Sequence, residues 1–219
     1  AWQTATGGQI PGGQISASGL PTAVQGLVGA KAISVGKEHA CAIRKDERVV
    51  CWGYNGQGQL GTANQEDTPK PVVVVGVFGA IAVSAGGQHS CAIDGEGLVW
   101  CWGANGDGQL GRGDTTPSTW PIKAKYISGM KRVAAGNRHT CALRNTGSVY
   151  CWGHNSSGAA GTGATSVSEP TAKAVVGSAP MLFGCFSADQ CGADGVCFKR
   201  TCVAGFCGTT TSADNSVCD

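Results

Sequence analysis

The sequence has little charge and few aromatic side chains for its length. Only 14% of its 219 residues are charged and 6% are aromatic, and the formal net charge is +2. Charges of both signs in near balance leave no basic footprint of the kind that binds nucleic acid or an anionic membrane. The composition therefore argues against nucleic acid as a partner.

Long apolar segments and closely paired cysteines are also missing. The uncharged stretch at residues 71–87 is short for a bilayer crossing, and its counterpart at residues 121–137 carries four basic residues. No two cysteines are separated by only two residues, so the usual spacings of structural zinc sites and haem attachment are absent. We expect neither a membrane span nor a bound metal or cofactor.

Glycine and cysteine, by contrast, are abundant. The 36 glycines favour short strands joined by tight turns over long helices. Twelve cysteines without metal-binding spacings indicate disulfides, and therefore an oxidising compartment. We expect a secreted protein that is extracellular or at the cell surface.

One unit recurs three times at a pitch of 50 residues. It reads "HACAIRKDERVVCWGYNGQGQLG" from His39, "HSCAIDGEGLVWCWGANGDGQLG" from His89 and "HTCALRNTGSVYCWGHNSSGAAG" from His139. In each copy, two short runs with apolar residues at alternate positions flank a segment of hairpin-turn composition. Several short strands per unit at this pitch are typical of a propeller blade.

The pattern G-x-x-H-x-C-A-φ … V-x-C-W-G-x-N-x-x-G-Q-L-G resembles the regulator of chromosome condensation repeat, in the cysteine-bearing form of secreted bacterial proteins. The third copy departs from it, because "GAAG" stands where the others have "GQLG". That family folds as a β-propeller, usually of seven blades, each a four-stranded antiparallel sheet. The resemblance therefore implies an all-β partial propeller of about three four-stranded blades.

The repeat phase divides the chain into three parts. Residues 1–25 keep the phase, since Trp2 lies one period before Trp52, and we interpret them as the trailing half of a degenerate blade. Residues 26–177 hold the three repeats, and residues 178–219 form a small disulfide-rich module. The sequence cannot choose among the fifteen pairings of the module's six cysteines. These are Cys185, Cys191, Cys197, Cys202, Cys207 and Cys218.

The repeated cysteines flank each hairpin at equal distances from its turn. Antiparallel pairing then places the two cysteines of a copy opposite each other, within reach of a disulfide. We predict three disulfides that staple the hairpins, and a redox site is the alternative reading. The predicted pairs are Cys41–Cys51, Cys91–Cys101 and Cys141–Cys151.

The other repeated side chains also have a structural and a functional reading. We expect the indoles of Trp52, Trp102 and Trp152 to be wedges between blades, whereas a glycan-stacking role would require them to be exposed. We expect His39, His89 and His139 to be structural. A catalytic alternative would use one of these or His154, but no nucleophile–base pair is evident. Asn155-Ser-Ser is a candidate glycosylation sequon.

Three and a half blades leave open strand edges, which is a liability for a soluble monomer. The chain is then part of a longer protein, half of a ring closed by two copies, or a subunit that joins copies head to tail. We expect a secreted, non-catalytic structural protein that assembles with itself into a larger assembly or filament. The alternative is an extracellular module that binds a cell-surface protein or glycan, of adhesion or inhibitor type.

Overall fold

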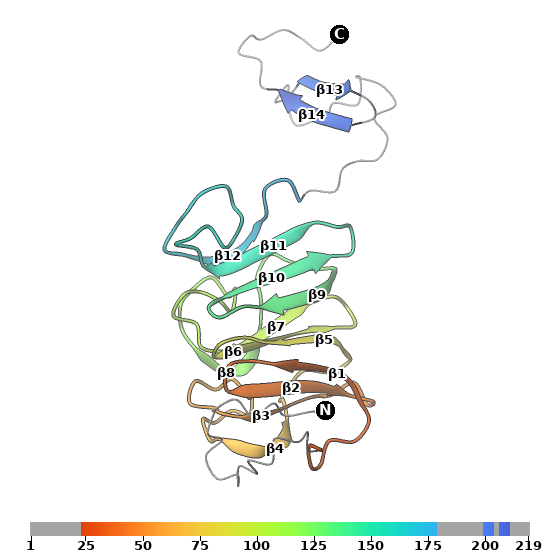
Figure 1. Ribbon diagram of the computed structural model, residues 1–219, viewed down its shortest axis with the longest axis vertical. Coiled ribbons are helices and arrows are strands. Elements are labelled where there is room, and N and C mark those ends of the chain that lie inside the picture. The colour runs from red at the N-terminus through yellow and green to blue at the C-terminus, as the bar shows by residue number, and fades with distance from the viewer. Residues whose placement is uncertain (1–22, 179–198, 204–205, 211–219) are drawn as a thin grey trace. The chain divides into compact units, whose positions relative to one another are not determined.

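The computed structural model of the chain describes residues 23–178, 199–203 and 206–210 (Figure 1). The chain divides into two units, Ala1–Ala179 and Pro180–Asp219, and each is described by itself. The regular elements of the described residues are all strands. Within these ranges no helix has the length and apolarity that a membrane crossing needs.

Three four-stranded antiparallel sheets make up the first unit. In each sheet consecutive strands pair in sequence order, as in a propeller blade. This confirms the all-β fold with three four-stranded blades. The first sheet contains β1 (Ala30–Val35), β2 (His39–Arg44), β3 (Val49–Gly53) and β4 (Thr68–Val73), the second β5 (Ala80–Ala85), β6 (His89–Asp94), β7 (Val99–Gly103) and β8 (Ser118–Lys123), and the third β9 (Met130–Ala135), β10 (His139–Arg144), β11 (Val149–His154) and β12 (Ser168–Ala174).

The sequence repeat is reproduced in the strand register. In the hairpin of β2 and β3, Cys41 lies opposite Cys51 and His39 opposite Gly53. The other two hairpins repeat this register one period and two periods later. A long loop then joins the third strand of each sheet to the fourth, and most of its glycines adopt positive φ, +79° at Gly58 for example.

The sheets stack on one another, with the second between the first and the third (Figure 1). One apolar core fills the space between the first two sheets, and it includes Leu60 from the first and Trp102 from the second. An equivalent core holds Leu110 and Trp152 between the second sheet and the third. Apolar burial between sheets is the main force that keeps such a stack together.

The two ends of the chain lie mostly outside the described residues. The predicted half blade of residues 1–25 is described only from residue 23, although Val24 and Leu27 pack against Trp52 on the first sheet. In the second unit, β13 (Lys199–Val203) and β14 (Phe206–Thr210) form a hairpin in which Cys202 lies opposite Cys207. The remaining expectations on this module and Trp2 fall outside the described ranges. These concern Cys185, Cys191, Cys197 and Cys218.

Candidate functional site

Each blade hairpin is closed by a disulfide. The bonds join Cys41 to Cys51, Cys91 to Cys101 and Cys141 to Cys151, with Cα–Cα distances of 4.0 to 4.1 Å. These are the pairs that the spacing predicts. The cysteines of the first two hairpins are fully buried, which keeps their sulfurs away from an attacking thiolate and suits a staple better than a redox site.

Two of the three repeated tryptophans, Trp102 and Trp152, are wedges between described blades. The indole Nε1 of Trp102 donates a hydrogen bond of 2.8 Å to the backbone oxygen of Gln59, and Trp152 does the same to Gln109. The indoles of Trp52, Trp102 and Trp152 are at most 2% exposed. Glycan stacking on these side chains is therefore excluded, and the glycan-binding alternative loses the residues on which it depended.

The repeated histidines form a polar relay between neighbouring blades. His39 Nε2 lies 2.8 Å from Ser90 Oγ, and that hydroxyl donates to the Gln59 carbonyl at 2.9 Å. The hydroxyl proton is thus engaged, so Nε2 carries its own proton and donates it to Ser90. The same relay follows one period later through His89, Thr140 and Gln109.

Burial keeps these two imidazole rings neutral. Removal from water lowers the pKa of His39 to about 4 and that of His89 to about 3, and the neighbouring His39 and His139 lower the latter further. His139 belongs to the last described sheet and is only partly buried. Among the described residues no hydroxyl meets it, so the relay stops there.

The repeated asparagines hold the long loops. Asn105 is completely buried, and its side chain accepts from the Leu110 amide and donates to the carbonyls of Asp114 and Thr116, each at 2.9 Å. Asn155 is equally buried. Glycosylation at Asn155 stays a prediction, and the sequon coincides with a buried structural asparagine.

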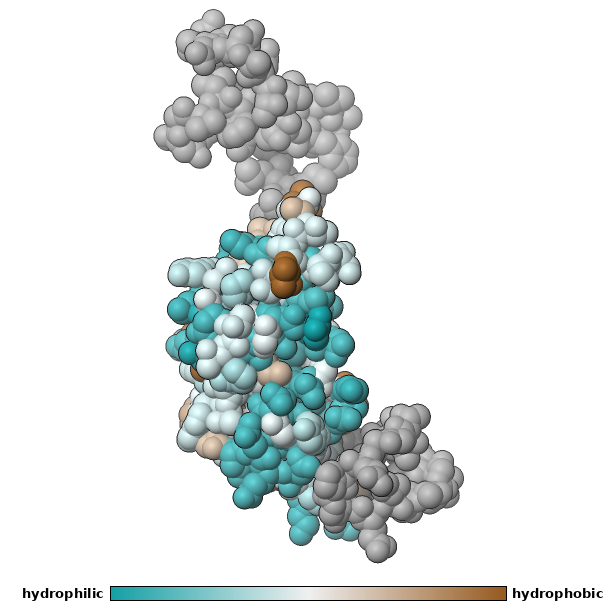
Figure 2. All heavy atoms as spheres, turned by 90° about the vertical axis from the view of Figure 1, so that its left-hand side faces the viewer, coloured by the Kyte–Doolittle hydropathy of each residue, from teal (hydrophilic) through white to brown (hydrophobic). Residues whose placement is uncertain are grey.

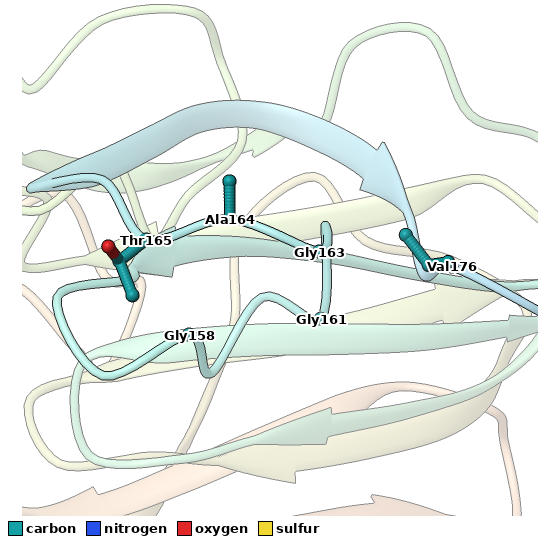
Figure 3. Close-up of a pocket in the computed structure, with 6 residues that line it drawn as sticks. All are labelled: Gly158, Gly161, Gly163, Ala164, Thr165 and Val176. Carbon is teal, nitrogen blue, oxygen red and sulfur yellow. The ribbon is translucent and has the colours of Figure 1, made fainter.

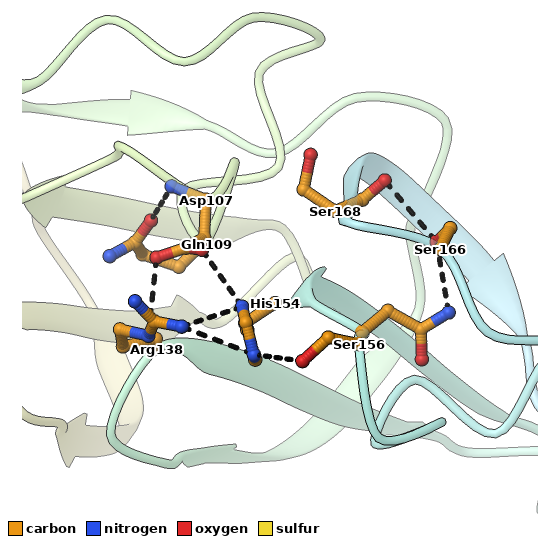
Figure 4. A network of polar contacts seen from close by, with 8 residues as sticks. Asp107, Gln109, Arg138, His154, Ser156, Ser166 and Ser168 are labelled. Carbon is orange, nitrogen blue, oxygen red and sulfur yellow. Dashed lines mark hydrogen bonds and ion pairs between the residues drawn. The ribbon is translucent and has the colours of Figure 1, made fainter.

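A polar cluster ties the second blade to the third, and the sequence analysis missed most of it (Figure 4). The Asp107 carboxylate contacts His154 Nδ1 at 2.9 Å and the Arg138 guanidinium at 3.4 Å. On the other side of the ring, His154 Nε2 lies 2.6 Å from Ser156 Oγ. Arg138 Nη2 also approaches this ring, 2.8 Å from Nδ1 and 3.1 Å from Nε2.

The signal that reveals this cluster is a local break in the repeat. Its members differ from their counterparts in the other two blades, whereas a residue that every blade needs for its fold should recur in all three. The counterparts are Tyr54 and Ala104 for His154, Gly56 and Gly106 for Ser156, Glu38 and Gln88 for Arg138, and Gln57 and Ser157 for Asp107.

The connectivity of Ser156, His154 and Asp107 is that of a nucleophile, a base and an orienting carboxylate. Two features favour a clamp instead. Arg138 competes with Ser156 for the ring nitrogens of His154, and Arg138 and His154 both hold the Asp107 carboxylate of the preceding blade. The cluster thus links two blades through charged hydrogen bonds.

The third sheet carries an open cavity on its outer side (Figure 3). Its volume is about 460 Å³. Six residues line it: Gly158, Gly161, Gly163, Ala164, Thr165 and Val176. The glycines belong to the long loop that, in the first two sheets, contacts the next blade. Within the described ranges, no group of three or more His, Cys, Asp or Glu side chains is placed to hold a metal ion.

Comparisons with known proteins agree with the repeat. Two family models, both described as regulator of chromosome condensation (RCC1) repeat, match the chain. One matches residues 46–93 and 96–143, and the other residues 30–59, 80–109 and 130–159. Together they extend over residues 30–159. No curated protein sequence matches the chain significantly.

Several solved structures share the fold. Prp20p from Saccharomyces cerevisiae, described with its binding to Gsp1p and histones, is 26% identical with a TM-score of 0.61 over 68% of this chain and 39% of its own. Yeast RCC1 (Prp20) with bound Kap60 is 26% identical with a TM-score of 0.62, over 71% of this chain and 38% of its own. Human WBSCR16 is 22% identical with a TM-score of 0.64 over 73% and 41%. The chain thus spans about two fifths of the length of these structures.

Proposed function

This chain belongs to the regulator of chromosome condensation (RCC1) repeat family, and we propose that it is an extracellular, non-catalytic protein-interaction module that assembles with copies of itself. Protein binding is the general part of this proposal. It is supported by the blades, and by yeast structures described with Gsp1p, histones and Kap60. Self-assembly, secretion and the lack of catalysis are its more specific parts.

Self-assembly is supported above all by the cavity on the third sheet. The first two sheets fill the equivalent space with a side chain and a strand of the next blade. In the third sheet this space is lined by loop glycines and Val176. An interface that repeats the junctions inside the chain would join copies head to tail.

Extracellular location is supported by the three blade disulfides. Reducing compartments keep cysteines as free thiols, whereas secreted proteins retain their disulfides. Protein purified without reductant should therefore show no free thiol at the six blade cysteines in a mass-spectrometric alkylation assay. Alkylated blade cysteines would argue for a reducing compartment.

Partner binding by the long loops is the alternative function. The loops of residues 54–67 and 104–117 differ in sequence between blades, which suits recognition of another molecule. The face in Figure 2 is largely hydrophilic, and its apolar residues are scattered rather than gathered in a patch. Such a surface favours a polar partner over a large apolar one.

The non-catalytic part of the proposal is tested at Ser156. If the cluster is a clamp, a fluorophosphonate probe should leave Ser156 unmodified, because Arg138 competes with Ser156 for the nitrogens of the His154 ring. The matched control is Ser157→Ala, whose side chain lies outside the cluster. Labelling of Ser156 that survives Ser157→Ala and is lost in Asp107→Asn would establish a hydrolytic serine.

Self-assembly is tested by the native mass of the non-reduced full chain. We expect light scattering after size exclusion to give a mass that rises with concentration, with dimers or longer polymers in negative-stain images. A monomer of 22.0 kDa at every concentration would leave the binding-module alternative.

A further inference from the structure

We infer that the open side of the third sheet is a docking site for the N-terminal half blade of a second copy, and that Trp2 is the indole that enters it. This inference rests on the proposed self-assembly and names the two surfaces that meet. We call the cavity lined by Gly158, Gly161 and Gly163 the open slot.

The junction between the first two sheets shows what such a slot accepts. A Cβ placed on Gly61 would lie 2.9 Å from the indole Nε1 of Trp102, and one placed on Gly58 would lie 2.7 Å from the Cα of Thr119. The Ala63 amide donates to the Thr119 carbonyl at 3.2 Å. The slot therefore holds one indole and the outer strand of the next sheet, both in direct contact with backbone.

The second junction repeats this arrangement. Its contacts run from Gly111 to Trp152, from Gly108 to Pro170, and from the Gly113 amide to the Pro170 carbonyl at 2.9 Å. The open slot is lined by Gly161, Gly158 and Gly163, which stand at these same three positions in the third repeat. The third sheet has thus kept the receiving half of the junction.

One hydrogen bond between neighbouring sheets has no equivalent at the third sheet, and this indicates which neighbour could dock there. In the first sheet, Ser34 Oγ accepts from the amide of Ala85, which lies on the first strand of the next sheet. Ser84 accepts in the same way from Ala135 at 2.9 Å. The third sheet has Ala134 at this position, so it offers no hydroxyl to a first strand. A neighbour without a first strand would lose no contact at this position.

The N-terminal end of the stack has lost the complementary group. Ser90 and Thr140 each receive the histidine of the preceding blade, but the first sheet has Ala40 at this position. That histidine belongs to the second strand of a blade, so the first sheet offers no hydroxyl to the second strand of a preceding blade. The alanines at both ends therefore fit a neighbour made of the trailing strands alone.

A comparison of the six tryptophans shows which indole is available to enter the open slot. Three of the six indoles are buried. Trp100 packs under Lys123 with its Nε1 bonded to Asp94, and Trp120 lies half exposed on β8. Trp2 remains, and it lies one period before Trp52. The second sheet separates the first from the third, so we assign the slot to Trp2 of a second copy.

The test uses one variant on each side of the interface, in the full chain. Trp2→Ala removes the indole, and Ala164→Arg fills the slot from an exposed position that needs no backbone change. We expect each variant alone to associate about 30-fold more weakly than wild type, as for an interfacial tryptophan. Mixed together, the two variants should form dimers and nothing longer, since one intact interface remains.

The controls carry the same chemical changes elsewhere. Trp120→Ala removes an exposed indole outside the slot, and Asn145→Arg adds the same charge on an exposed hairpin turn of the third sheet. Both should assemble like wild type in sedimentation velocity. Variants at residues 2 and 164 that also assemble like wild type would overturn the docking site and leave self-assembly standing. A monomeric wild type would overturn both.

Discussion

Asn105 fixes a long loop with a single buried amide. Its one oxygen and two N–H groups meet one amide and two carbonyls of the same loop, so the side chain acts as a template for the chain around it. The requirement for both an acceptor and two donors explains why Asn recurs in all three blades. It also explains why Asn155, the asparagine of the sequon, is buried.

Replacement of this amide tests the role directly. Asn105→Asp keeps the acceptor for the Leu110 amide but places a carboxylate against two carbonyls in a buried site. We expect a loss of about 3 kcal/mol in the free energy of unfolding, measured by urea denaturation. The matched control is Asn145→Asp on an exposed turn, where the change should stay within about 0.5 kcal/mol. Equal small effects at both sites would contradict the template role.

The buried histidines make the protein sensitive to acid. An unfolded histidine has a pKa of 6.5, whereas burial lowers the pKa of His39 to about 4 and that of His89 to about 3. Between these values the unfolded chain binds protons that the native chain does not. The contribution of neutral burial is therefore complete above pH 6.5 and is lost as the pH falls from 6.5 toward 4 and then 3.

The urea midpoint measured from pH 7.5 to 3.5 checks this window. It should fall with pH below 6.5, and His89→Gln should flatten that fall relative to its own value at pH 7.5. Asp46 does not act between pH 6.5 and 4, since its bond to Arg44 lowers its pKa from 3.8 to about 2 and its contribution is lost only as the pH falls from 3.8 toward 2. A midpoint that is constant between pH 6.5 and 4 would show that the rings are not held neutral.

At the scale of the element, the hairpin was the most predictable part of the structure. A repeat with no insertions fixes which residues are equivalent, and a symmetric hairpin turn fixes which cysteines face each other. Cys91 lies opposite Cys101 for this reason. The strands β4 and β5 likewise follow from one apolar stretch interrupted by glycine turns.

The clamp was not predictable in the same way. Asp107 lies 47 residues from His154 in the chain, and the two meet only because the blades stack. The break in the repeat marks the positions as unusual, but it does not say that they touch. The half blade at the N-terminus also stays a prediction, because it lies almost wholly outside the described residues.

Removal of one staple measures what a hairpin disulfide contributes. The pair Cys91→Ala and Cys101→Ala opens a loop with a sequence separation of 10 residues. The chain-entropy cost of such a loop is about 2–3 kcal/mol, and we expect the unfolding free energy to fall by about that amount. Reduction of the wild type should give a larger loss, since all three hairpins open. An unchanged urea midpoint in the double variant would show that the staple contributes nothing beyond packing.

At the scale of the whole molecule, the stack behaves as a one-dimensional array in which each blade is stabilised by its neighbours. The second sheet has a neighbour on both sides. The third has a described neighbour on one side only, and the burial of its second strand reflects this. All but the last residue of β6 are buried, whereas only two of the six residues of β10 are.

This asymmetry predicts an order of opening that depends on assembly. In dilute protein, amide hydrogens of β10 should exchange faster than those of β6, because local unfolding begins where fewest contacts hold a strand. At concentrations where copies associate, docking on the open slot should slow exchange in the long loop of residues 155–165 and in β10, and leave β6 unchanged. The Trp2→Ala variant should show no such slowing at any concentration. Protection that rises equally in all three sheets would mean that copies associate elsewhere, since an interface at the third sheet alone cannot stabilise one end of the stack and the middle to the same degree.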